Sequence, residues 1–268
     1  MAVDCNHDCS SCKSKCEVEY LPLQEGSTIK KIIGVVSGKG GVGKSLVTSL
    51  MASRMAREGY KVGILDADLT GPSIPKAFGL KGMLEGDGKG IFPAETKEGI
   101  KVVSVNLLVE DETNPIIYRG PALSGLVSQM YKDVYYGDLD YLFIDMPPGT
   151  ADVNLTILKQ IPLTGLIIVS TPQDLVRVIV EKSLKMADIL NVPVLGLVEN
   201  MSYMLCPHCN EKVYPFGQSH ANTIVQDFNI PLLAEIPINQ EITKLVDSGN
   251  ISSYFAEEMD VLVSKISI

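Results

Sequence analysis

The sequence contains no tryptophan, and none of its apolar runs is long enough to cross a bilayer. Its first residues are polar and rich in cysteine, so they lack the apolar stretch of a secretory signal peptide. Lysine and arginine form no basic stripe, and the formal net charge is −9, whereas binding to a phosphate backbone requires clustered positive charge. We therefore expect a cytoplasmic protein whose main partner is neither a membrane nor a nucleic acid.

Cysteine is scarce, and the six cysteines fall into two groups. Four lie within the first sixteen positions, and the other two form a pair separated by two residues. This is not the spread of a disulfide framework, and in a reducing compartment closely spaced thiols are typical of metal ligands. The candidate ligands are Cys5, Cys9, Cys12, Cys16, Cys206 and Cys209.

The rest of the composition suits one globular domain behind a short tail. Hydrophobic residues make up 46% of the 268 residues and charged residues 21%, which is ordinary for a chain that buries a core. Residues 1–28 are polar and contain several cysteines. They cannot bury enough apolar surface to fold alone without a metal. We expect a tail over residues 1–28, either disordered or organised by a metal, and a single domain over residues 29–268.

From Ile29 onward, short apolar runs alternate with amphipathic stretches. Helices are predicted over Leu46–Glu58, which Gly59 would end, and over Gln173–Leu190, where apolar residues recur at helical spacing. The segment Gly79–Gly99 predicts a loop or a peripheral hairpin. Strands that alternate with helices imply an α/β fold with a doubly wound, mostly parallel sheet. The predicted strands are Ile32–Ser37, Val62–Asp66, Tyr141–Asp145, Leu166–Ser170, Val194–Glu199 and Leu232–Ile236.

A glycine-rich motif links the first predicted strand to the first predicted helix. It matches G-x-x-x-x-G-K-S in the strand–loop–helix context that a phosphate-binding loop (P-loop) requires. Glycines let backbone N–H groups surround phosphate oxygens, and the helix N-terminus adds its dipole. We expect Lys44 to reach the β and γ phosphates of ATP and the Ser45 hydroxyl to ligate Mg²⁺. The motif consists of Gly38, Lys39, Gly40, Gly41, Val42, Gly43, Lys44 and Ser45.

Aspartates end two later strands and point to the same crevice, because ligands bind at the carboxyl ends of parallel strands. Asp145 begins the segment Asp-Met-Pro-Pro-Gly, which is typical of a magnesium-site carboxylate followed by a switch loop. Asp66 is expected to hold a Mg²⁺-bound water, and Asp68 to orient the attacking water. A single aspartate at a strand end is more often a cap or turn residue. Three such residues in register with a P-loop favour a catalytic site.

These motifs resemble those of a known group of proteins. Lys39, the extra lysine after the first glycine, resembles the signature of the deviant Walker A group that includes MinD, ParA and the nitrogenase iron protein. Within that group, the sequence is most similar to the Mrp/ApbC family of iron–sulfur cluster carriers, from about Ile29 to the C-terminus. The matching segments are residues 37–45, 66–68, 71–75, 119–121, 139–141, 145–150, 170–173, 199–202 and 206–209.

The resemblance implies a homodimer that binds ATP at its interface, hydrolyses it slowly, and delivers a 4Fe-4S cluster to apo-proteins. Lys39 would cross the interface to the partner's phosphates, and the expected catalytic residues are Lys39, Lys44 and Asp68. Asn200 would read the adenine edge, with Pro237 and Ile238 lining the base. Leu46 and Ala151 depart from common family residues, but neither is expected to be a phosphate ligand. The tail spacing differs from that of the eukaryotic relatives, which leaves its metal open.

The pair Cys206 and Cys209 allows several interpretations. Two thiolates complete neither a zinc site nor a cluster site. An isolated pair of this kind can also be a redox-active or buried thiol pair, and zinc competes with iron–sulfur for thiolates. A 4Fe-4S cluster takes four thiolates, so we expect the pairs of two chains to hold one bridging cluster near a two-fold axis. The rival arrangement joins the pair to two tail cysteines, which would otherwise hold a second cluster or zinc.

Three functions compete: a cluster carrier, a positioning or partitioning ATPase of the MinD or ParA type, and a zinc-stabilised regulatory ATPase. A MinD-like protein would end in a basic amphipathic helix. Here the C-terminal stripe of Phe255, Met259 and Leu262 has acidic neighbours and is expected to pack into the core. The nitrogenase iron protein is disfavoured because its cluster cysteines lie on separate segments.

Overall fold

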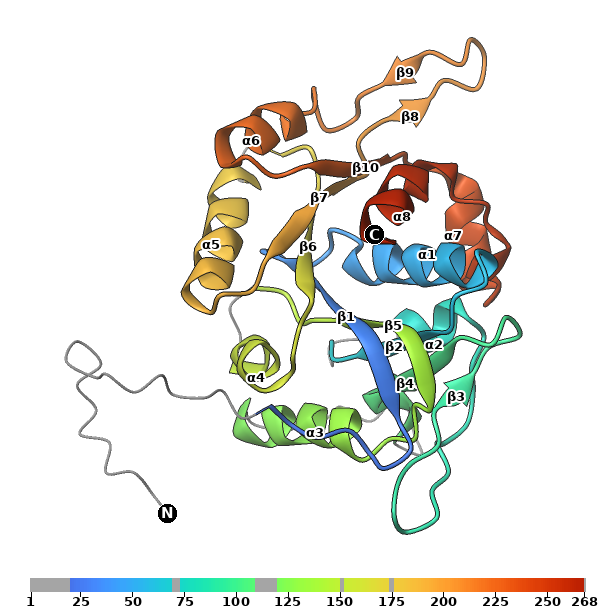
Figure 1. Cartoon of the computed structure of the whole chain (residues 1–268). Coiled ribbons are helices and arrows are strands. Elements are labelled where there is room, and N and C mark those ends of the chain that lie inside the picture. Colours follow the sequence, from blue (N-terminus) through green and yellow to red (C-terminus); the bar gives the residue numbers. More distant parts are fainter. Residues whose placement is uncertain (1–19, 69–72, 109–119, 150–151, 174–175, 268) are drawn as a thin grey trace, which may run out of the picture.

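The computed structural model describes residues 20–68, 73–108, 120–149, 152–173 and 176–267. These residues form one eight-stranded sheet between two layers of helices, with a small separate hairpin at one end (Figure 1). The strand order is β10-β7-β6-β1-β5-β2-β4-β3, and only β3 runs antiparallel to its neighbour. The prediction of a doubly wound, mostly parallel α/β sheet is confirmed.

The elements follow the alternation read in the sequence. The strands are β1 (Thr28–Ser37), β2 (Val62–Asp66), β3 (Ala94–Glu95), β4 (Lys101–Ser104), β5 (Asp138–Asp145), β6 (Gly165–Ser170), β7 (Val194–Asn200) and β10 (Leu232–Ile236), with β8 (Met204–Leu205) and β9 (Lys212–Val213) in the hairpin. The helices are α1 (Lys44–Arg57), α2 (Ser73–Ala77), α3 (Gly120–Lys132), α4 (Asp152–Gln160), α5 (Val176–Ile189), α6 (Ala221–Phe228), α7 (Gln240–Asp247) and α8 (Asp260–Ile266).

All six predicted strands are present, most with one or more extra residues at an end. The segment Gly79–Gly99 is largely irregular and ends in β3, a two-residue edge strand paired with β4. Sequence analysis assigned no element to β4 or α3. β4 has only four residues, and the apolar Val102 and Val103 alone do not distinguish a strand from a loop.

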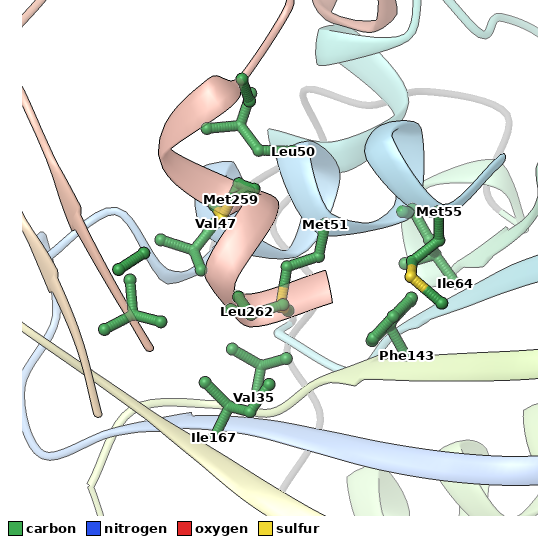
Figure 2. Close-up of a cluster of buried hydrophobic side chains, with 14 of the residues drawn as sticks. Val35, Val47, Leu50, Met51, Met55, Ile64, Phe143, Ile167, Met259 and Leu262 are labelled. Carbon is green, nitrogen blue, oxygen red and sulfur yellow. The ribbon is translucent and has the colours of Figure 1, made fainter. Parts of the chain in front are cut away.

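Helices cover both faces of the sheet, and each face has its own core. On one face α1, α2, α7 and α8 pack around Val35, Ile64 and Phe143. In this core α1 and α8 lie side by side on the sheet, and Met51 of α1 and Leu262 of α8 belong to the same cluster as Val35 (Figure 2). On the other face α3 to α6 cover the sheet (Figure 1). Close packing of this kind resists displacement, so it fixes α1 and the phosphate loop at its start.

The expected C-terminal core stripe is only partly present. Met259 and Leu262 are fully buried, but Phe255 is 60% exposed, so its assignment to the core was wrong. Phe255 precedes the short helices rather than lying on their inner face. The guanidinium groups of Arg54 and Arg57 lie 5.6 and 5.2 Å from the ring centroid, which makes the residue a cation–π partner of α1.

Part of the expected tail contacts the domain. The Leu21 N–H donates to the Gln160 carbonyl at the end of α4 (2.9 Å), and Leu21 and Leu23 pack against the core of that face. β1 itself begins at Thr28, whose N–H donates to the Gly137 carbonyl. The four tail cysteines lie outside the described residues.

Two glycines bring α2 and α7 into backbone contact. Gly79 follows α2 and Gly249 follows α7, and both have positive φ, 67° and 70°. A Cβ on Gly79 would lie 2.9 Å from the Gly249 carbonyl oxygen, and one on Gly249 would lie 2.5 Å from the Gly79 Cα. No side chain fits at either position.

Candidate functional site

The phosphate loop lies where β1 ends at the centre of the sheet. Gly41 and Gly43 adopt φ angles of 78° and 79°, which residues with a side chain rarely adopt. Lys44 and Ser45 are the first residues of α1, so the N–H groups of that helix end face the loop. The loop borders a cavity of about 290 Å³ that is also lined by Asp68, Pro148 and residues of α2 and α7. This geometry fits a bound phosphate chain.

Lys44 is held between two of the predicted acids. Its side chain is 5% exposed, and its Nζ lies 2.7 Å from Asp145 Oδ1 and 3.2 Å from Asp68 Oδ2. The Ser45 hydroxyl donates to Asp145 Oδ2 (2.5 Å), and the Thr48 hydroxyl donates to Asp145 Oδ1 (3.1 Å). The structure thus brings together Lys44, Ser45, Asp68 and Asp145, as the sequence predicted.

Asp66 completes the acidic group. It lies beside Asp145 in the register of β2 and β5, and both carboxyls are buried. Burial, followed by the nearby charge of Asp145, raises the pKa of Asp66 well above its ordinary value, while the Ser104 hydroxyl (2.9 Å) counteracts this. Burial also raises the pKa of Asp145, and Lys44 opposes that shift.

These residues fit a magnesium ion. Three aspartates face one buried ammonium group, so the site has carboxylate charge that a divalent cation would balance. Carboxylate and hydroxyl oxygens are the hard ligands that Mg²⁺ prefers. The raised pKa values of Asp66 and Asp145 agree with this, because buried carboxyls that lack enough nearby positive charge favour the protonated form.

The switch loop is held by a residue that no sequence motif singled out. Asn154, buried in the first turn of α4, donates through Nδ2 to the carbonyls of Pro147 (2.9 Å) and Gly149 (2.7 Å). The Gly149 N–H in turn donates to the Ser37 carbonyl at the start of the phosphate loop (2.8 Å). The segment after Asp145 is therefore tied to both α4 and the phosphate loop. Only the tertiary contacts distinguish this asparagine from other helix residues.

Lys39 contacts its own chain. Its ammonium group donates to Gln173 Oε1, on the loop that leads from β6 toward α5. Gln173 belongs to the segment 170–173, one of those that carry the family resemblance. The expected role of Lys39 across a dimer interface stays a prediction.

A second cavity adjoins the first and contains the residues expected at the base. It measures about 240 Å³, is lined by Asn200, Pro237 and Ile238, and shares Leu46 with the phosphate cavity. Asn200 Nδ2 donates to the Val42 carbonyl in the phosphate loop (2.9 Å), and its Oδ1 accepts from the Met201 N–H. A Cβ on Gly43 would lie 2.2 Å from this Nδ2. Asn200 therefore supports the phosphate loop besides lining the second cavity.

The cysteine pair lies on the β8–β9 hairpin, which projects from the end of β7 beside β10 (Figure 1). Both cysteines are free, and the Cys206 N–H and carbonyl are bonded within the turn to Glu211 and Asn210 (both 2.9 Å). Hydrogen bonds from the His208 and Cys209 N–H groups and the Cys209 thiol lower the pKa of Cys206, which favours the thiolate. Among the described residues, no third His, Cys, Asp or Glu side chain joins this pair to form a metal site, so the pair needs further ligands from elsewhere.

The hairpin begins two residues beyond a buried polar group. The Ser202 hydroxyl donates to the Glu199 carboxylate (2.7 Å), and the Ser202 N–H donates to the Ile236 carbonyl in β10 (3.0 Å). Burial, partly offset by this hydroxyl, raises the pKa of Glu199. Glu199 and Asn200 are consecutive, so the root of the cysteine hairpin and the support of the phosphate loop belong to the same strand end.

None of the helices in the described ranges has the length and apolar character of a membrane span.

Comparison with known proteins agrees with these features. A family model described as ParA, NUBPL iron-transfer P-loop NTPase, matches residues 28–267. The iron-sulfur cluster carrier protein of Clostridium perfringens is 44% identical over 270 residues, which cover 93% of this chain and 95% of the relative. The cytosolic Fe-S cluster assembly factor CFD1 of Kluyveromyces lactis is 41% identical over 240 residues, covering 86% and 85%.

Solved structures show the same fold. The nucleotide-binding protein of Archaeoglobus fulgidus in complex with ADP is 43% identical, with a TM-score of 0.78 over 87% of this chain and 91% of that chain. The cell division ATPase MinD of Pyrococcus furiosus is 20% identical, with a TM-score of 0.60 over 88% and 98%, and so shares the fold alone. The positioning alternative is therefore not favoured, and the chain belongs to the iron-transfer P-loop NTPase family of cluster carriers.

Proposed function

We propose that this protein binds and hydrolyses ATP and carries a 4Fe-4S cluster, held by Cys206 and Cys209 of two chains, to apo-proteins. The observation that carries the proposal is the connection between the two sites. β7 ends in Asn200, which bonds to the phosphate loop, and the chain continues directly into the cysteine hairpin. A nucleotide-dependent change at the loop therefore has a short covalent and hydrogen-bonded route to the thiols.

The phosphate site supplies the hydrolysis. Lys44 would exchange its carboxylate partners for the β and γ phosphate oxygens, and the backbone N–H groups of residues 38–45 would surround the phosphate chain. Mg²⁺ would be held by Ser45 and, through water, by Asp66 and Asp145, and would neutralise phosphate charge. Asp68, 3.2 Å from Lys44, would orient the attacking water. Asn200, Pro237 and Ile238 would hold the base in the second cavity.

The proposed assembly is a homodimer. Lys39 would leave Gln173 and reach the phosphates of the partner chain, which would complete each site only in the dimer. The thiol pair supplies two of the four ligands that a 4Fe-4S cluster takes, so two chains supply the full set. The cluster is cargo in this scheme, and a shared site on an exposed hairpin suits a cargo that is given away.

A cytoplasmic location is part of the proposal. It is supported by the relative named as a cytosolic assembly factor and by closely spaced cysteines, which stay reduced in that compartment. The tail cysteines Cys5, Cys9, Cys12 and Cys16 are proposed to hold a second cluster or zinc.

The test separates the hairpin thiols from the tail thiols. In the full chain, all four tail cysteines are replaced by serine, and the protein is reconstituted without oxygen with iron and sulfide. We expect one cluster per dimer, that is about two irons and two sulfides per chain, on a protein that elutes as a dimer. Adding Cys206→Ser or Cys209→Ser should abolish both the cluster and the cluster-dependent dimer.

Other results would contradict the proposal. A cluster on a monomer, or one that survives either substitution, would exclude the bridging arrangement. A colourless protein with stoichiometric zinc would favour the zinc-stabilised ATPase instead. Loss of the cluster in the tail variant alone would show that hairpin and tail share one site.

A further inference from the structure

A groove between α4 and α5 plays no part in the nucleotide or cysteine sites. It measures about 400 Å³ and lies on the face of the sheet opposite α1 (Figure 1). Its apolar lining includes Leu155 and Ile189, which are 37% and 77% exposed, and its polar lining consists of lysines alone. We call it the α4–α5 groove; the residues used below are Leu155, Lys159, Lys182, Lys185 and Ile189.

The charge of the groove is opposite to that of the protein. The formal net charge of the chain is −9, yet the groove is lined by three exposed lysines and by no acidic residue. Lys185 is paired along its own helix with Glu181 (2.7 Å), whereas no salt bridge of Lys159 or Lys182 is found among the described residues. An apolar floor with a positive rim complements a segment that carries an apolar side chain flanked by carboxylates.

Both helices of the groove lead out of loops in the nucleotide site. Asn154, the neighbour of Leu155 in α4, donates to the carbonyls of Pro147 and Gly149 in the switch loop. α5 follows the loop of Gln173, the residue that accepts the Lys39 hydrogen bond. The two walls of the groove are thus connected to separate loops of the nucleotide site.

We propose that the α4–α5 groove is the docking site for an acidic, amphipathic segment of the apo-protein that receives the cluster. This rests on the proposed function, because it concerns the recipient of the cargo. Lysine and apolar residues together also suit an anionic membrane surface. A concave site favours a protein segment, because a hollow accepts an inserted side chain whereas a lipid surface offers none.

The experiment uses a 4Fe-4S-type apo-ferredoxin with an acidic surface as the probe. Its binding to the cluster-free full chain is measured by fluorescence anisotropy at low and high salt, and cluster transfer from the loaded chain is followed by circular dichroism. Lys159→Glu with Lys182→Glu reverses the charge of the groove. Lys89→Glu with Lys97→Glu makes the same charge change on exposed lysines of the loops around β3, at the far edge of the sheet.

We expect the groove variant to bind the apo-ferredoxin roughly tenfold more weakly and with less salt dependence, because charges at the rim of an interface set the association rate. The β3-loop control should bind like the wild type, and both should keep wild-type ATP hydrolysis and cluster content. Ile189→Ser should weaken binding without changing its salt dependence, which separates the apolar floor from the charged rim.

The proposal is overturned if the wild type does not bind the apo-ferredoxin, if the groove variant binds as the wild type does, or if both double variants lose binding equally. Sedimentation with phosphatidylglycerol vesicles that depends on Lys159 and Lys182, without ferredoxin binding, would assign the groove to a membrane and also overturn it. Binding through the groove without cluster transfer would leave the docking site standing and contradict the proposed function.

Discussion

Lys44 shows how much of the site is set by single residues. Its buried ammonium group lies between the carboxylates of Asp145 and Asp68, which balance its charge. A buried charge without a partner is strongly unfavourable, so these ion pairs stabilise the fold. The side chain that would bind the phosphates of ATP therefore also contributes to stability.

Lys44→Ala should accordingly have two effects. Nucleotide binding should fall sharply, because the positive charge on the β and γ phosphates is gone. Without nucleotide, the variant should also have a free energy of unfolding lower by up to about 3–5 kcal/mol, because Asp145 and Asp68 lose their partner. Protonation of these aspartates would reduce that loss. Calorimetric titration with ATP and denaturant unfolding measure the two effects. Wild-type affinity in a folded variant would exclude Lys44 from the phosphate site.

Lys39→Ala should behave differently. Among the described residues, the Lys39 side chain hydrogen-bonds to Gln173 alone, so its loss should leave folding and nucleotide binding nearly unchanged. Hydrolysis should be suppressed, because the proposed target lies in the partner's site. Steady-state phosphate release at saturating ATP measures this. Hydrolysis at the wild-type rate would show that this lysine does not act across an interface.

Glu199 gives the protein a pH dependence whose sign follows from its environment. Burial raises its pKa above the ordinary value of 4.5, so the folded state favours the protonated carboxyl. The protonated carboxyl therefore adds to the free energy of unfolding. This stabilisation is fully present at pH values below the pKa that Glu199 has in the unfolded chain, and it is lost as the pH rises through its pKa in the folded chain. The Glu199→Gln variant keeps an acceptor for the Ser202 hydroxyl but has no carboxyl to titrate. Its free energy of unfolding should therefore fall less than that of the wild type between pH 5 and pH 8. Urea unfolding at both pH values, with the exposed Glu85→Gln as control, tests this; an unchanged pH dependence would contradict it.

Among the elements, β7 connects the two sites. Its last residue, Asn200, binds the phosphate loop from the side where Gly43 leaves no room for a Cβ. The next residues form the root of the cysteine hairpin, held to β10 through Ser202. The strand end is thus shared by a nucleotide-binding loop and a metal-binding hairpin.

Asn200→Ala should disturb both. Losing the bond to the Val42 carbonyl leaves a buried acceptor unsatisfied, at a cost of about 1–3 kcal/mol. If that cost falls on the loop, ATP affinity decreases roughly five- to 150-fold. Cluster release should also lose its response to ATP. Asn222→Ala, on the exposed side of α6, is the control; unchanged nucleotide affinity in the Asn200 variant would contradict the connection.

The elements best predicted from the sequence are those with a run of apolar residues. β2, which is fully buried, and the edge strand β10 both have the predicted bounds. β4 has only four residues and β3 only two, which is too short for that pattern. Phe255 was misassigned because helical spacing alone does not show where a helix begins.

At the scale of the whole molecule, the contacts at the junction between tail and domain determine how much of the N-terminus can be deleted without loss of stability. Residues 2–19 are polar and cysteine-rich and lie before every residue of the phosphate site, so their deletion should leave a folded ATPase. Deleting residues 2–28 also removes Leu21, Leu23 and the first pair of β1, and should cost a further 2 kcal/mol or so of stability. Thermal unfolding of both truncated proteins compares them. Equal melting temperatures would show that residues 20–28 contribute nothing.

The parts of the candidate site that consist of residues close together in the sequence could be predicted. A P-loop and the aspartates at strand ends lie together because parallel strands place their carboxyl ends at one edge. The roles of Asn154, Gln173 and Ser104 were not predictable, since each depends on a contact between segments distant in the chain. The pairing of Asn200 with Val42 is of the same kind, and it adds a supporting role to the residue expected at the base.

The contact between Gly79 and Gly249 has a kinetic consequence. Ala77 in α2 and Val246 in α7 line the phosphate cavity from two sides, and the glycines after them are in backbone contact. Separating α2 from α7 at that end would break this backbone packing, so we expect ADP to leave through another side of the cavity. In the proposed dimer, where Lys39 reaches the partner's phosphates, the second chain would cover the phosphate site. ADP release would then be no faster than subunit separation, and the lifetime of the dimer would set the turnover rate of the ATPase.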